Sequence, residues 1–285
     1  MTIAVGAKYP WGSLNKLPPP DSNIPEAVII ASDSRFSKMQ GTALTPIIDV
    51  GTKVFQLGID ATAVYAGTSR IGEACIDELR WKLSKQHISK SDHSKKIAQK
   101  VFQDVYKHSL SEMKLTKYDA PLYIMIGACN KQGKAELYSA SYDTNFSLEP
   151  VTGLNAVALP TTKDFFYYLL NNELNKQIED ELSRRSRYPK IPWASWVPMP
   201  IPAIHVAILI TATLNIIIQT NADRSIGGLV QCALMTKEGV SFPGISYTAD
   251  PSNKGPGWTR ATAKQDELKT VTGTSSLFSF YHLSD

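Results

Sequence analysis

Apolar residues alternate with small or polar ones at the start of the chain, in the stretch MTIAVGAKYP. The odd-numbered residues from Ile3 to Tyr9 fall on one side, and this period of two is typical of a β-strand. The apolar run AVIIASD, residues 27–33, predicts a buried strand that ends in a polar turn. Residues 53–57 and 61–66 are two further short runs around the turn GID, so they predict a hairpin. The first part of the chain therefore predicts antiparallel strands.

The period changes to that of a helix in the next two segments. Apolar residues recur every four positions from Ile71 to Leu83, within the stretch SRIGEACIDELRWKLSK that begins at Ser69. Residues 91–110 repeat this pattern, so each predicted helix has one apolar face that can lie on a sheet. The strand pattern then returns in three runs, residues 120–130, 135–142 and 154–160.

Two more helices and a last group of strands are predicted in the second half. Thr161 and Asp164 suit a capping box at the start of a helix whose apolar stripe runs over residues 166–182. Residues 201–224 are strongly apolar and nearly long enough to cross a bilayer, but polar residues interrupt them. We therefore interpret them as a buried helix. Residues 227–247 predict the final strands.

This order of elements predicts an α+β fold. Two sheets that pack face to face, with a helical pair on each outer side, would bury every apolar face named above, which gives a four-layer αββα sandwich. No internal repeat or linker divides the sequence, so we predict one domain over residues 1–285. Extra segments lie at about residues 10–26 and 183–200, and a polar tail begins at about residue 249. The Trp- and Pro-rich stretch 188–202 indicates a protein contact, a lid or packing on the protein's own surface.

Composition narrows the class of protein. Hydrophobic residues make up 43% of the chain and charged residues 20%, which supplies enough apolar material for a packed core. The net charge of +4 is too small and too dispersed to predict nucleic-acid binding. Cys75, Cys129 and Cys232 lie far apart in apolar stretches, so they predict buried thiols and neither a disulfide framework nor a metal site. Because buried thiols suit a reducing cytoplasm and the amino end lacks the pattern of a secretory signal, we expect a cytoplasmic protein. The interpretation of residues 201–224 as a buried helix leads us to expect no membrane partner.

Thr2 is the first residue with candidate chemistry. Methionine before a small residue is usually removed, and removal of Met1 would make Thr2 the first residue of the chain. A hydroxyl becomes a good nucleophile only when a base accepts its proton. The free α-amine of a first residue has a pKa of about 7.7–8.0, so it can be that base at neutral pH. Such an enzyme needs no histidine, no metal and no organic cofactor.

Five stretches of the sequence together resemble a known family. The stretches are TIAVGAKY, AVIIASDSRFS, DVGTKVFQL, AVYAGTS and ADRSIGGLVQCALMTKEG. They look like proteasome β-subunits and their bacterial relatives, notably the heat-shock-locus V peptidase, from Thr2 to about Gly239. The resemblance implies the αββα sandwich of N-terminal-nucleophile hydrolases and a threonine peptidase or amidohydrolase. It also implies a homo-oligomer, as a ring or a related assembly, a peptide or amide substrate and an ATP-dependent unfoldase as a further partner.

The resemblance assigns roles to five residues. Thr2 stands where the family has its nucleophile, and Asp33 matches the aspartate that orients the catalytic lysine. Lys53 matches that lysine, whose charge would lower the proton affinity of the threonine site. Gly67 matches the glycine whose backbone N–H stabilises the oxyanion. Asp223 matches the acid that supports the amino-terminal site.

The sequence also departs from the family pattern. Leu159 or Pro160 stands where the family has a serine before its third helix, and Ile226 replaces a second serine. A water molecule or Ser225 could replace the lost hydroxyls, or the chain is an inactive, proteasome-like scaffold subunit. An amidase for small amides, from the same superfamily, fits the site residues equally well. If Met1 stayed attached, the amine would become an amide and lose its basicity.

Overall fold

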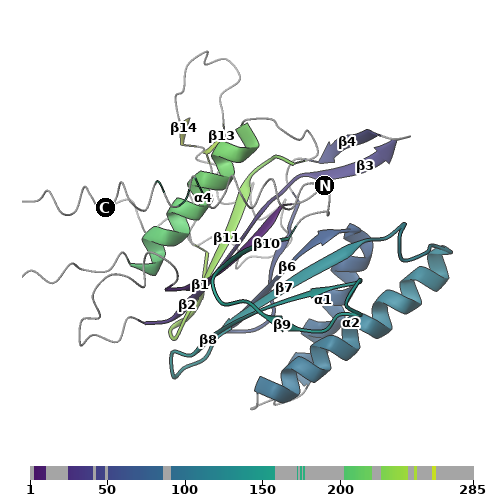
Figure 1. The fold of residues 1–285 in the computed structure, drawn as a ribbon, viewed down its shortest axis with the longest axis horizontal. Helices are drawn as coiled ribbons and strands as arrows, with labels where there is room; N and C mark the ends of the chain where they lie inside the picture. The colour runs from purple at the N-terminus through teal and green to yellow at the C-terminus, as the bar shows by residue number, and fades with distance from the viewer. Residues whose placement is uncertain are drawn as a thin grey trace, which may run out of the picture.

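A computed structural model describes most of the chain outside the predicted extra segments and the tail. The described residues are 3–10, 25–40, 43–48, 51–85, 91–157, 172, 174, 176, 202–219, 226–242, 247–248 and 259–260. Over these residues the chain forms two five-stranded sheets, two separate strand pairs and three helices with defined bounds (Figure 1).

The first sheet brings together strands from both ends of the described chain. Its strands, in spatial order, are β10 (Leu154–Val157), β1 (Ala4–Tyr9), β2 (Ala27–Asp33), β11 (Val230–Thr236) and β12 (Gly239–Ser241). All neighbours are antiparallel. The alternating pattern of the first residues is confirmed as β1, and the buried run after residue 26 as β2. The β2–β11 register places Asp33 opposite Val230, and Ser32 opposite Gln231.

The second sheet is formed by the middle of the chain. Its strands, in spatial order, are β5 (Val54–Gln56), β6 (Ala61–Gly67), β7 (Leu122–Cys129), β8 (Ala135–Ser141) and β9 (Glu149–Pro150). The predicted hairpin is confirmed, because β5 and β6 pair antiparallel around the turn at residues 58–60. Two further pairs were not predicted: β3 (Phe36–Gln40) with β4 (Ala43–Ile48), and β13 (Tyr247–Thr248) with β14 (Thr259–Arg260).

Each sheet carries helices on one face (Figure 1). Helices α1 (Ser69–Lys85) and α2 (Ser91–Met113) begin where their sequence patterns begin, and they pack on the second sheet. Helix α4 (Ala203–Gln219) packs on the first sheet through its buried aliphatic side chains. Residues 172, 174 and 176 are also helical, and Leu174 lies in the same core as α4. None of the helices in the described part of the chain has the length and apolarity needed to cross a membrane.

The other faces of the two sheets pack against each other. Val28 and Ile30 of β2 lie in this inter-sheet core, whereas Ile29 and Ala31 point to the α4 side, as the period of a strand requires. Gly6 allows close approach, because a Cβ there would lie 3.0 Å from the Met125 sulfur and 3.1 Å from a Leu137 methyl. The described residues are therefore layered as α4, first sheet, second sheet, and the α1–α2 pair.

Several predictions concern residues outside the described ranges. They include the cap at residues 161 and 164, the extra segment 10–26 apart from residues 10, 25 and 26, and the whole extra segment 183–200. The Trp- and Pro-rich stretch apart from residue 202 and the tail from residue 249 apart from residues 259–260 also lie outside the described ranges. The single-domain organisation and the complete four-layer sandwich of N-terminal-nucleophile hydrolases stay predictions. The three cysteines are confirmed as buried free thiols.

Candidate functional site

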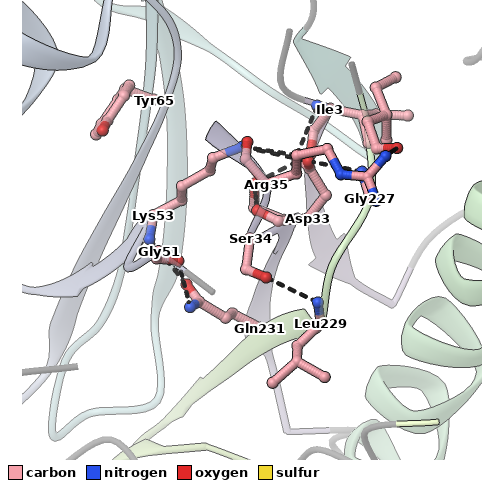
Figure 2. Close-up of polar contacts among 12 residues, drawn as sticks. Ile3, Asp33, Ser34, Arg35, Gly51, Lys53, Tyr65, Gly227, Leu229 and Gln231 are labelled. Carbon is pink, nitrogen blue, oxygen red and sulfur yellow. Dashed lines mark hydrogen bonds and ion pairs between the residues drawn. The ribbon is translucent and has the colours of Figure 1, made fainter. Parts of the chain in front are cut away.

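The site centres on a buried ion pair between the two sheets (Figure 2). The Lys53 ammonium lies 3.2 Å from each carboxylate oxygen of Asp33, and both side chains are 0% exposed. Asp33 is the last residue of β2, and Lys53 directly precedes β5. The pair therefore joins the end of β2 in the first sheet to the start of β5 in the second sheet. A buried pair of this kind is stable only when further hydrogen bonds satisfy its polar atoms.

Asp33 receives such bonds from two main-chain amides. The Ile3 N–H donates to Oδ1 at 3.0 Å, and the Gly227 N–H donates to Oδ2 at 3.2 Å. Ile3 is the residue covalently joined to Thr2, and it leads directly into β1. The Ser32 hydroxyl donates to the Ile3 carbonyl at 3.0 Å, so Ile3 is bonded through both its N–H and its carbonyl. The carboxylate therefore ties the beginning of the described chain to the segment just before β11.

The turn after Asp33 is held by the same segment. The N–H groups of Ser34 and Arg35 both donate to the Gly227 carbonyl, at 3.2 and 3.0 Å. The Ser34 hydroxyl accepts the Leu229 N–H at 2.7 Å, and the Arg35 guanidinium donates to the Ile226 carbonyl at 3.2 Å. The Lys53 ammonium also donates to the Arg35 carbonyl. Residues 34–35 are therefore held both by the segment that precedes β11 and by the Lys53 ammonium.

Burial changes the proton affinity of both charged groups. It raises the pKa of the Asp33 carboxyl above its ordinary value, although the Lys53 ammonium and the Gly227 and Ile3 amides oppose the shift. It lowers the pKa of the Lys53 ammonium, opposed by the Asp33 charge and assisted by the charge of Arg35. Both shifts reduce the cost of moving a proton from the Lys53 ammonium to the Asp33 carboxylate. Shifted pKa values of this origin are typical of functional sites, although structural ion pairs also produce them.

Gly67 occupies the end of β6, next to the start of α1. Its φ of +119° lies in the region that favours glycine, and a Cβ would come within 2.1 Å of the Pro121 carbonyl oxygen. In the β5–β6 register Val54, the residue after Lys53, lies opposite Val64, three residues before Gly67 on the same strand. The geometry explains why this position is glycine. Its role as an oxyanion donor stays a prediction.

The structure thus brings together Asp33 and Lys53, and it places Gly67 at the end of β6, the strand that pairs with β5 directly after Lys53. Thr2 and Asp223 lie outside the described residues, as do Leu159, Pro160 and Ser225. Ile226, which replaces a serine of the family pattern, is 3% exposed and packs in the core that α4 shares with the first sheet. Among the described residues, no three His, Cys, Asp or Glu side chains gather in a way that could hold a metal ion.

Sequence reasoning missed Gln231, whose side-chain amide bonds the main chain on both sides of Lys53. It is a lone polar residue in the apolar run LVQCALM, and this was the available signal. Arg35 and Gly227 were also missed, because each acts largely through its main chain. No protein-family model matches the chain, and none of the curated proteins gives a significant match to it.

Proposed function

We propose that the chain is a threonine-type N-terminal-nucleophile hydrolase that cleaves amide bonds, with peptides as the substrate class. The observation that carries this proposal is the bond from the Ile3 N–H to Asp33, within the buried Asp33–Lys53 pair. The chain reaches this pair one residue after Thr2, the nucleophile expected from the sequence. The proposal requires that whatever precedes Thr2 be removed, so that its amine is free.

The proposed reaction uses the groups as follows. The Thr2 hydroxyl oxygen attacks the amide carbonyl carbon, and the Thr2 α-amine accepts the hydroxyl proton. The Gly67 N–H stabilises the oxyanion, and the α-amine then donates the proton to the departing nitrogen. Water hydrolyses the resulting ester and regenerates Thr2. The charge of Lys53, held by Asp33, lowers the proton affinity of the threonine site.

Assembly into a homo-oligomeric ring and cooperation with an ATP-dependent unfoldase are part of the same proposal, on the strength of the sequence resemblance. Sedimentation velocity of the purified chain tests the first point, because a ring sediments far faster than a 31.4 kDa monomer. We also propose a reducing cytoplasmic compartment. Its support is that Cys75, Cys129 and Cys232 are all free thiols.

The decisive test combines mass spectrometry with hydrolysis assays. The intact mass reports whether Thr2 is the first residue, and a panel of fluorogenic peptide amides reports turnover. We expect processed protein to hydrolyse part of the panel, Thr2→Ala to lose all turnover, and Thr2→Ser to retain some. Turnover by Thr2→Ala equal to that of the unaltered chain would overturn the assignment.

Ile226 favours a second candidate, an inactive scaffold subunit. Its buried aliphatic side chain offers no hydroxyl for moving protons on the amine. A scaffold would assemble normally and show no turnover in any variant. A small-amide amidase would hydrolyse short amides in the panel and leave the longer peptides intact.

A further inference from the structure

The main chain that carries Lys53 lies outside regular secondary structure. Residues 51–53 precede β5 and belong to no strand, yet Gly51 and Lys53 are buried. Buried N–H and C=O groups that lack a strand partner must find other partners. A lysine side chain has four rotatable methylene groups, so the position of its ammonium also depends on a fixed main chain. Whatever holds this segment therefore sets where the Lys53 ammonium lies.

Gln231 of β11 supplies those partners from the opposite sheet (Figure 2). Its Oε1 accepts the Lys53 N–H at 2.8 Å and the Val54 N–H at 3.1 Å. Its Nε2 donates to the Gly51 carbonyl at 2.8 Å. One side-chain amide thus bonds three main-chain groups within four consecutive residues. The amide therefore bonds this main-chain segment much as a neighbouring strand would.

The segment is also held by the turn that follows β2. The Gly51 N–H donates to the Ser34 carbonyl at 2.8 Å, directly after Asp33. Gln231 pairs with Ser32 in the β2–β11 register, so one attachment comes from β11 and the other from the turn directly after β2. The main chain around Lys53 is therefore attached to β11 and to the residue that directly follows Asp33.

A buried glutamine at this place lowers the stability of the fold unless its amide forms hydrogen bonds. Ala233 and Met235, on the same face of β11, lie in the apolar core between the sheets. Gln231 is 9% exposed, and an amide buried here without hydrogen-bond partners would destabilise the fold. An aliphatic side chain would fill the space without that risk. The amide is explained by the three bonds that it makes to the Lys53 segment.

We propose that Gln231 is a positioning residue for Lys53, which holds residues 51–54 so that the ammonium reaches Asp33. The effect of this positioning on catalysis rests on the proposed hydrolase function. The effect of this positioning on the Lys53 ammonium is independent of that function, because the ammonium can be observed in the full chain without any substrate.

The direct test is ¹³C NMR of protein labelled at lysine Cε. The Lys53 signal is assigned by its disappearance in Lys53→Arg, which keeps the charge. In Gln231→Met the segment loosens and water reaches the ammonium, so we expect the Lys53 signal to shift and any titration midpoint to rise toward that of an exposed lysine. Gln231→Asn, whose amide is one methylene shorter, should give the same change if the methionine variant fails to fold.

Thr62→Val is the matched control. The Thr62 hydroxyl is also buried between the sheets and contacts the Met235 sulfur at 2.6 Å, but it makes no bond to residues 51–54. We expect its Lys53 signal to match that of the unaltered chain. A Lys53 signal and midpoint that are unchanged in the Gln231 variants, or changed equally in Thr62→Val, would overturn the proposal.

The activity measurement then separates the two proposals. If the chain hydrolyses amides, Gln231→Met should lower kcat about 10- to 100-fold, leave KM within about threefold and shift the pH profile of kcat. Thr62→Val should stay within about twofold. A chain without any hydrolysis refutes the proposed function, whereas the NMR comparison still decides whether Gln231 positions Lys53.

Discussion

Lys53→Met removes a cation from a carboxylate that is closed to water. Asp33 would keep its bonds from the Ile3 and Gly227 amides, but its charge would lose the ammonium at 3.2 Å. Removing one partner of a buried ion pair costs about 3–5 kcal/mol, because the remaining charge must be buried alone or change its protonation. Asp33→Asn creates the converse problem for the ammonium, so we expect a loss in the same range.

The double variant carries neither charge. Its free energy of unfolding should therefore fall by less than the sum of the two single losses, with a difference of about 2 kcal/mol or more. Urea unfolding followed by circular dichroism gives the three values by linear extrapolation. Glu78 and Lys82 form the control pair, since they lie 3.7 Å apart on α1 with side chains 40% and 41% exposed. Their Glu78→Gln and Lys82→Met cycle should give a coupling below about 1 kcal/mol.

The reasoning fails if the Asp33 and Lys53 losses add to within about 0.5 kcal/mol. Additivity would mean that the two charges do not interact in the folded chain, and the geometry of the site would then be wrong. A double variant whose loss of unfolding free energy exceeds the sum of the two single losses would also contradict the reasoning.

Two further predictions follow from the described residues. Gly67→Ala should lower the free energy of unfolding by at least about 2 kcal/mol, because its φ is +119° and its Cβ would meet the Pro121 oxygen at 2.1 Å. Gly58→Ala, where the nearest atom is 3.8 Å away, should change it by less than about 1 kcal/mol, and equal losses in the two variants would refute this reading. Burial raises the pKa of the Cys232 thiol from 9.0 to about 12, so between these pH values the folded chain binds more protons than the unfolded one and stability falls as pH rises. Between pH 8 and pH 10, the free energy of unfolding of Cys232→Ala should therefore fall by about 1 kcal/mol less than that of the unaltered chain, as measured by urea unfolding. Equal falls in the two proteins would contradict the pKa shift.

Elements with a strong local period could be predicted from the sequence. The alternation of the first residues became β1, and the four-residue period after Ser69 became α1. The β3–β4 pair was missed because its residues lack a clear alternation and include Pro46, which usually argues against a strand. Strand β9 has only two residues and leaves no periodic signal.

The candidate site depends on contacts between residues far apart in the chain. Asp33 and Lys53 were named together only through the family resemblance, since nothing in their local sequences indicates a contact. The Gly227 amide lies 194 positions from Asp33, and a main-chain donor leaves no mark on side-chain pattern. Gln231 differs, because one polar residue in an apolar strand is visible in the sequence. Its partner could be identified only once the two sheets were placed together.

The measurement that tests the central claim most directly is the site of acylation by a peptide β-lactone. The lactone ring opens when a hydroxyl oxygen attacks its carbonyl, so the adduct has the summed mass of protein and lactone. We predict one adduct per chain, located at Thr2 by peptide mass spectrometry and strongly reduced in Lys53→Met. An adduct on another residue, or none on chains that begin at Thr2, would contradict the claim that Thr2 acts beside the Asp33–Lys53 pair.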